Sequence, residues 1–156
     1  NMFIYYLYWK MRTYTGKFIP KNPKKYKGNF NNIVYRSSWE LKLMFRLDMD
    51  PNVISWGSEE IVIPYRSPID NKIHRYFVDF IVTLINKQGI KETILIEVKP
   101  KSQTEPPKLK SKITKKYITE VKTWGVNEAK WKAAREFCAD RKWKFEILTE
   151  KELGVK

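Results

Sequence analysis

The sequence predicts an α/β fold with the element order α-β-β-β-α-β. Two helical stretches carry this prediction, residues 37–47 and 116–140, together with four strand-like runs at residues 60–65, 74–82, 93–99 and 144–148. Helices that alternate with strands in this way predict a layered fold around one sheet. The chain has 156 residues, of which 42% are hydrophobic, so we expect one domain that buries its own core.

Local signals place the ends of these elements. Ser37 has the position of an N-cap for the first helix, and Asp50, which precedes a proline, should end it. A turn around Gly89 joins the second and third strands into an antiparallel hairpin. Apolar residues at helical spacing between positions 126 and 137 indicate the long second helix. Residues 149–154 read as a short polar tail.

The charge of the chain indicates a polyanionic partner. The formal net charge is +14 and the isoelectric point is about 9.8. Residues 10–27 hold seven lysines or arginines and no acid, and the loop 99–116 holds seven lysines and one acid. Because the sequence has no 18-residue apolar span, we expect nucleic acid and not a membrane to be that partner.

Three segments are expected along the chain. Residues 1–10 form an extension, residues 11–35 a basic N-terminal arm, and residues 36–156 the main domain, with Met11 as the expected original start. The single cysteine and single histidine exclude an internal disulfide and argue against zinc chemistry. A reducing, intracellular setting fits this composition.

Three charged side chains stand out at the ends of two neighbouring strands. Asp79 lies within the apolar run 76–82, and Glu97 and Lys99 end the run that begins at Thr93. Residues two apart in a strand share a face, so Glu97 and Lys99 project together. Paired carboxylate oxygens suit Mg²⁺, and a nearby ammonium suits the anionic transition state of phosphate chemistry.

With these residues the chain resembles the PD-(D/E)xK nuclease superfamily. Asp79 matches the family's aspartate, Glu97-Val98-Lys99 matches its (D/E)xK motif, and Glu40 matches a glutamate that many members carry on the first helix. Within the superfamily the chain is most similar to TnsA-like endonucleases and to the head-completion nucleases of tailed phages. The segments that carry this resemblance are residues 16–23, 35–40, 74–80, 96–100 and 127–135. Val78 stands where relatives often have proline, which affects the strand and not the chemistry.

The resemblance implies a restriction-endonuclease-like core, with a mixed central sheet flanked by helices. It implies an endonuclease that hydrolyses DNA phosphodiester bonds, with Glu40, Asp79, Glu97 and Lys99 as catalytic residues. Asp79, Glu97 and the Val98 carbonyl would bind Mg²⁺, for which Mn²⁺ should substitute, and Glu40 would help bind a second metal or its water. Portal or head proteins would be further partners, and the enzyme would enter the virion or act in the host cell. Both a monomer and a homodimer stay open.

The basic residues are expected to bind the DNA backbone, and this gives affinity without sequence information. We therefore expect selection for DNA structure or DNA ends. The candidate DNA-binding residues are Arg75, Lys101, Lys108, Lys110, Lys112, Lys115, Lys116 and Lys130.

Other readings stay open for several of these residues. Glu40 follows Ser37 at the spacing of a capping box, so it can be a helix cap. Lys99 can transfer a proton or neutralise charge, and Lys130 can face the site or the solvent. Glu59 and Glu60 are expected to be solvated, and His74 is expected to be structural or to contact phosphate.

Two other functions also stay open. One is a junction-resolving or transposon-end endonuclease of the same fold. The other is a non-catalytic head-completion protein that holds DNA by its charge.

Overall fold

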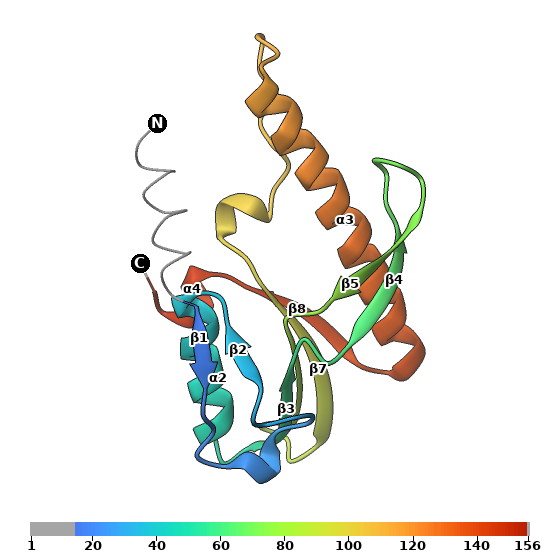
Figure 1. The fold of residues 1–156 in the computed structure, drawn as a ribbon. Helices are drawn as coiled ribbons and strands as arrows, with labels where there is room; N and C mark the ends of the chain where they lie inside the picture. The colour runs from blue at the N-terminus through green and yellow to red at the C-terminus, as the bar shows by residue number, and fades with distance from the viewer. Residues whose placement is uncertain (1–14, 156) are drawn as a thin grey trace.

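A mixed four-stranded sheet forms the centre of the computed structural model, which describes residues 15–155 (Figure 1). Its strands are β3 (Val53–Ser58), β6 (Phe80–Ile85), β7 (Lys91–Val98) and β8 (Lys144–Leu148), in the order β3-β6-β7-β8. β3, β6 and β7 are antiparallel, and β8 pairs in parallel with β7. The predicted mixed central sheet is confirmed.

Two helices cover opposite faces of this sheet (Figure 1). Helix α2 (Ser38–Met49) packs with Phe80 and Val82 of β6, whereas Ile81 of the same strand packs in the cluster beneath α3 (Lys115–Arg141). β7 divides its side chains in the same way, because successive residues of a strand point to opposite faces. The sheet therefore has apolar residues on both faces and lies between two hydrophobic cores. This agrees with the expectation of a central sheet flanked by helices.

The basic N-terminal segment is folded against the α2 core. It forms β1 (Gly16–Phe18), the 3₁₀ turn η1 (Pro23–Lys25) and β2 (Ile33–Tyr35), and β1 and β2 pair antiparallel. Phe18, Tyr26 and Ile33 are buried in that core. The boundary expected at residues 35–36 stays a prediction, and the expected extension 1–10 lies outside the described residues.

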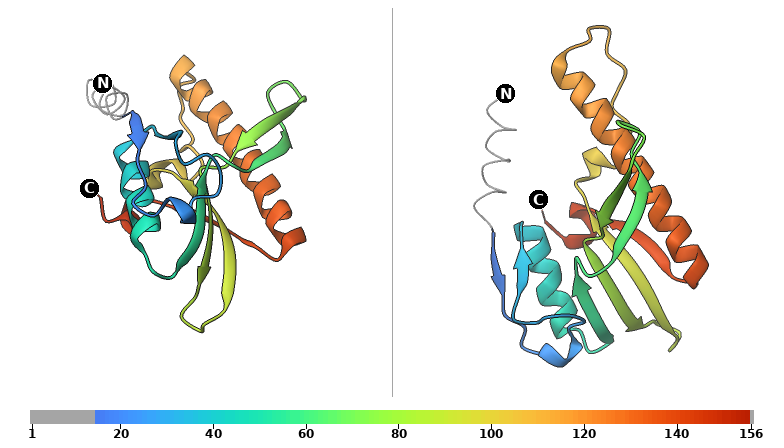
Figure 2. Two further views of the ribbon diagram at one scale, coloured as in Figure 1. Left: turned by 60° about the horizontal axis from the view of Figure 1, so that its bottom comes forward. Right: turned by 45° about the vertical axis from the view of Figure 1, so that its right-hand side comes forward.

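A two-stranded ribbon stands apart from the central sheet and corrects two sequence expectations. It consists of β4 (Val62–Arg66) and β5 (Ile73–Phe77) and lies beside α3 (Figure 2). The strand predicted at 60–65 therefore belongs to this ribbon and not to the central sheet. The run predicted as one strand over 74–82 divides at Val78–Asp79 into β5 and β6. The central sheet takes its remaining antiparallel strand from β3, which was not predicted.

The other predicted elements agree with the structure to within a few residues. The Ser37 hydroxyl accepts a hydrogen bond from the Glu40 amide at 3.1 Å and caps α2, and Asp50 ends that helix. Gly89 adopts φ +76° in the β6–β7 turn, a conformation that glycine accommodates without strain. The predicted polar tail contains a short helix, α4 (Glu150–Leu153), whose Leu153 is fully buried. Within residues 15–155 no helix is long and apolar enough to span a membrane.

Candidate active site

Asp79 and Glu97 lie opposite each other where β6 begins and β7 ends. The antiparallel register pairs Phe80 with Ile96, so the next pair along the two strands is Asp79 and Glu97. The Asp79 carboxylate accepts a hydrogen bond from the Val98 amide at 2.8 Å. The structure thus brings together the aspartate and the glutamate of the predicted motif.

The two carboxylates repel each other in a mostly buried setting. Glu97 is 5% exposed. Burial, and next the negative charge of Glu97, raise the pKa of Asp79 well above its ordinary value. The Lys99 ammonium lies 3.5 Å from the Glu97 carboxylate and offsets part of this charge. One buried and one half-buried carboxylate beside a single ammonium leave an excess of negative charge that a cation would neutralise.

The donor set fits a hard divalent cation. Asp79 and Glu97 offer carboxylate oxygens, which Mg²⁺ prefers. The N–H and C=O of one residue point to the same side of a strand, so the Val98 carbonyl lies on the side of Asp79. Within residues 15–155, however, no three His, Cys, Asp or Glu side chains converge closely enough to hold a metal. The fit therefore rests on this pair, and the metal role of Glu40 stays a prediction.

Tyr76 holds the second oxygen of Glu97, and sequence reasoning did not find it. Its hydroxyl donates a hydrogen bond to Glu97 Oε2 at 2.5 Å, and Tyr76 is 3% exposed. Burial and the Glu97 charge raise the pKa of Tyr76, so this hydroxyl stays protonated and keeps its donor role. Glu97 is therefore fixed from both sides, by Tyr76 at one oxygen and by Lys99 at the other.

Glu40 lies at the start of α2 and takes part in the local capping. Its carboxylate accepts a hydrogen bond from the Arg36 amide at 2.9 Å, one residue before the amide that a capping box would use. Burial raises the pKa of Glu40, as do the charges of Glu59 and Glu97. Glu40 thus has a cap contact and also lies within the electrostatic field of the carboxylate pair.

Arg36 and Glu59 form an ion pair beside the site, with 2.6 Å between the guanidinium and the carboxylate. The Glu59 amide donates to the Asp79 carbonyl at 3.1 Å, and Glu59 adopts φ +55°, which is uncommon for a residue with a side chain. From the sequence Glu59 is expected to be solvated, and its ion pair with Arg36 was not predicted. Glu60 accepts a hydrogen bond from the Tyr26 hydroxyl at 3.1 Å.

Lys130 of α3 lies on the site side of its helix. Its ammonium lies over the ring of Tyr76 at 5.5 Å from the centroid, and over that of Tyr65 at 5.7 Å. Of the two readings left open for Lys130, the one that faces the site is supported. His74 instead contacts the Asp70 carboxylate at 2.8 Å, which agrees with a structural role in the β4–β5 turn.

The other candidate DNA-binding residues are exposed. Arg75 stacks over Phe77 with 5.6 Å between the guanidinium and the ring centroid, and Lys110 is paired with Glu120 at 3.8 Å. The 3₁₀ turn η2 (Lys101–Gln103) and the lysine-rich loop connect the end of β7 to the far end of α3 (Figure 1). The remaining lysines of this set are Lys101, Lys108 and Lys112 before α3 and Lys115 and Lys116 in its first turn. Their contact with DNA stays a prediction.

Comparison with known proteins shows to which family the chain belongs. Residues 50–150 match the family model of the TnsA-like endonuclease N terminal. The chain is also 43% identical over 141 residues to the head completion nuclease of Enterobacteria phage T4, which covers 88% of this chain and 91% of that protein. The range matched by the family model includes Asp79, Glu97 and Lys99. The chain therefore belongs to the family of TnsA-like endonucleases.

Proposed function

We propose that this protein is a metal-dependent DNA endonuclease that acts in phage head completion. The observation that carries the proposal is the facing pair of half-buried Asp79 and buried Glu97, with the Lys99 ammonium 3.5 Å from the Glu97 carboxylate. The relative named head completion nuclease supports the biological task. Processing DNA ends at a filled head would use the charge of +14 for contacts with the DNA backbone.

The residues have distinct roles in this proposal. Asp79, Glu97 and the Val98 carbonyl would hold one Mg²⁺, and Glu40 would help bind a second ion or its water. When bound, such an ion would lower the pKa of a water and so make it a nucleophile near neutral pH. Tyr76 keeps the Glu97 carboxylate in one orientation through its hydrogen bond. Lys99 would neutralise charge on the phosphate as an ammonium, or would take the proton of the water if it enters the step as a neutral amine.

The lysine-rich loop 99–116 and the basic N-terminal segment would contact DNA phosphates. Such contacts carry no sequence information, so selection would follow DNA structure or DNA ends. Portal or head proteins as partners, a homodimer, and action in the host cell or the virion belong to this proposal as well.

Cleavage by Asp79→Ala and Glu97→Ala, compared with wild type in Mg²⁺ and in EDTA, tests the proposal. Supercoiled, linear, single-stranded and four-way-junction DNA are the substrates, and Glu136→Ala is the control because that carboxylate is 68% exposed on α3. Both site variants should lose cleavage and keep DNA binding, since removing a carboxylate takes negative charge away from the phosphate site. Full activity in EDTA, or cleavage by either variant at the rate of the control, would refute the metal site.

The same assay separates the two roles of Lys99. Arginine keeps the positive charge but does not give up a proton at neutral pH. If Lys99→Arg restores cleavage lost in Lys99→Ala, the residue neutralises charge; if it restores none, the residue transfers a proton. A preference for the four-way junction would assign the chain to junction resolution, and binding without cleavage would assign it to a structural role in the head.

A further inference from the structure

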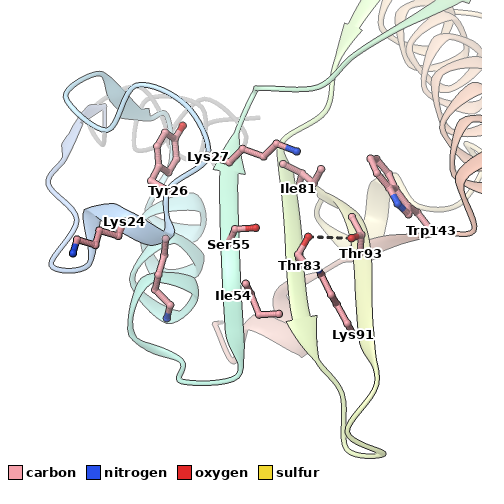
Figure 3. Close-up of a pocket in the computed structure, with 11 residues that line it drawn as sticks. Lys24, Tyr26, Lys27, Ile54, Ser55, Ile81, Thr83, Lys91, Thr93 and Trp143 are labelled. Atoms are coloured by element: carbon pink, nitrogen blue, oxygen red, sulfur yellow. Dashed lines mark hydrogen bonds between the residues drawn. The ribbon is translucent and has the colours of Figure 1, made fainter.

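A pocket of about 460 Å³ lies on the central sheet, away from the carboxylate pair (Figure 3). Its floor contains Ser55, Thr83 and Thr93, which are register partners across β3, β6 and β7. One wall is the segment Lys24–Lys27, and Trp143 lines the opposite side. From this pocket we infer a binding site for unpaired nucleotides of a DNA strand that reaches the active site, which rests on the proposed nuclease function.

The charge of the pocket supports an anionic ligand. Four lysines line it, Lys24, Lys25, Lys27 and Lys91, and no acidic residue does. The Lys25 ammonium is occupied, since it donates to the carbonyls of Asp48 and Asp50 at 3.1 and 2.6 Å. Lys27 and Lys91 are exposed, and within residues 15–155 neither is paired with a carboxylate. With Lys24, which is also exposed, three lysines of the pocket are therefore available to bind phosphates, and Lys27 and Lys91 are the two that the binding experiment replaces.

The neighbouring acid does not cancel this charge. Glu92 follows Lys91 in β7, where successive side chains point to opposite faces, and its carboxylate is paired with Lys144 at 3.0 Å. In Figure 3 the Lys27 side chain extends from the wall across the strands toward Ile81. The Thr83 and Thr93 hydroxyls bond to each other at 3.0 Å, which leaves acceptor positions and one proton for a ligand.

The size and the aromatic wall of the pocket favour an unpaired strand over a duplex. Duplex DNA is a stiff rod that cannot enter a hollow of about 460 Å³. Single-strand sites combine a basic groove with aromatic side chains on which bases stack. Trp143 supplies such a side chain here, and its ring also packs edge-on against Phe137 with 6.0 Å between centroids, which fixes its orientation.

The position of the pocket connects it to the active site. Thr83 lies four residues after Asp79, with Ile81 between them on the same face of β6. At about 3.3 Å per residue, the pocket floor begins about 13 Å from Asp79, the length of about four stacked nucleotides. A strand whose phosphate is at Asp79 and Glu97 can therefore run along β6 and place its unpaired end in this pocket.

Binding of labelled oligonucleotides to the full chain in EDTA tests the inference. The variant is Lys27→Ala/Lys91→Ala, and the control is Lys132→Ala/Lys151→Ala, which removes the same charge from exposed positions of α3 and α4. The probes are an oligothymidylate, an abasic strand of equal length and a duplex. Thermal unfolding confirms that each variant is folded.

Removing two phosphate contacts should make the slope of log K against log salt shallower by about 1.4 for the single strand. If variant and wild type bind the single strand equally at about 1 M salt, this difference in slope makes the variant bind about 60-fold more weakly than wild type at about 50 mM salt. Duplex affinity and the control variant should change by less than about threefold. Equal losses for duplex and single strand, or a loss no larger than that of the control, would overturn the inference.

The abasic strand tests Trp143. Wild type should bind the oligothymidylate more tightly than the abasic strand, and Trp143→Leu should remove this preference. Equal binding of both strands by wild type would exclude a nucleotide site. These binding measurements need no metal, so a result that refutes the nucleotide site does not affect the proposed cleavage activity. The proposed activity is refuted separately, by cleavage that survives in Asp79→Ala.

Discussion

Replacing Tyr76 by phenylalanine removes the hydroxyl that donates a hydrogen bond to the Glu97 carboxylate. The hydrogen bond is 2.5 Å long, and the two residues are 3% and 5% exposed. Phenylalanine keeps the ring, so no cavity opens. A hydrogen bond to a buried charged group contributes about 1.5–3 kcal/mol to stability. For a chain of this size each kcal/mol lowers Tm by about 2–4 °C, so Tyr76→Phe should lower Tm by about 3–12 °C in EDTA.

Thermal unfolding followed by circular dichroism, with and without Mg²⁺, measures this effect and connects it to the metal. In the variant, the Glu97 carboxylate has lost the hydrogen bond from Tyr76. A Mg²⁺ ion bound to Glu97 would stabilise this carboxylate in its place. At ten times its dissociation constant, Mg²⁺ should stabilise the wild type by about 1.4 kcal/mol. The variant should gain more than this, so its deficit in Tm should narrow as Mg²⁺ is added.

Tyr65→Phe is the matched control. Tyr65 lies in the same core cluster, its ring also lies under Lys130, and within residues 15–155 its hydroxyl makes no hydrogen bond, unlike that of Tyr76. This control should lose less than about 0.5 kcal/mol. If Tyr76→Phe and Tyr65→Phe have the same Tm in EDTA, the hydrogen bond from Tyr76 to Glu97 does not contribute to stability. A deficit that Mg²⁺ leaves unchanged would exclude Glu97 as a ligand.

Two further outcomes follow from the carboxylates. Glu40→Gln keeps an oxygen for the Arg36 amide, so Tm should change little. Cleavage should fall about 10–100-fold if Glu40 orients the metal or its water. Cleavage near the wild-type rate would mean that Glu40 serves only as a helix cap. For Asp79 the folded-state pKa is raised, so metal-free stability should fall as pH rises from about 3.9, the unfolded value, through the folded pKa. The advantage of Asp79→Asn over wild type in EDTA should therefore grow with pH, and urea unfolding from pH 4.5 to 8 that showed the reverse trend would contradict the burial argument.

The helices and the β6–β7 hairpin could be predicted because their signals are local. Ser37 caps α2 through its own side chain, and Asp50 ends the helix before a proline. The turn at Gly89 needs only a residue that tolerates positive φ. Asp79, Glu97 and Lys99 were also found locally, as charges at the ends of apolar runs. These features depend on residues that are close in sequence, which is what a single sequence reveals.

β3 and the ribbon were not predicted correctly because their partners are distant in sequence. Val53–Ser58 lacks regular alternation and contains a glycine, although Trp56 within it is completely buried. The run 74–82 keeps an extended, apolar character across residue 78, where the chain leaves the ribbon and enters the central sheet. Periodicity reports exposure along a strand and not the identity of the neighbouring strand, so this change of sheet leaves no signal.

The same break explains why Tyr76 was missed and how it reaches the site. In one regular strand over 74–82, Tyr76 would lie three residues before Asp79 and point to the opposite face. The chain instead bends at Val78 and Asp79, between β5 and β6. This bend brings the Tyr76 hydroxyl to Glu97, 21 residues away in sequence. The bend that ends the ribbon therefore places Asp79 at the start of β6 and supplies the hydrogen bond that orients its partner carboxylate.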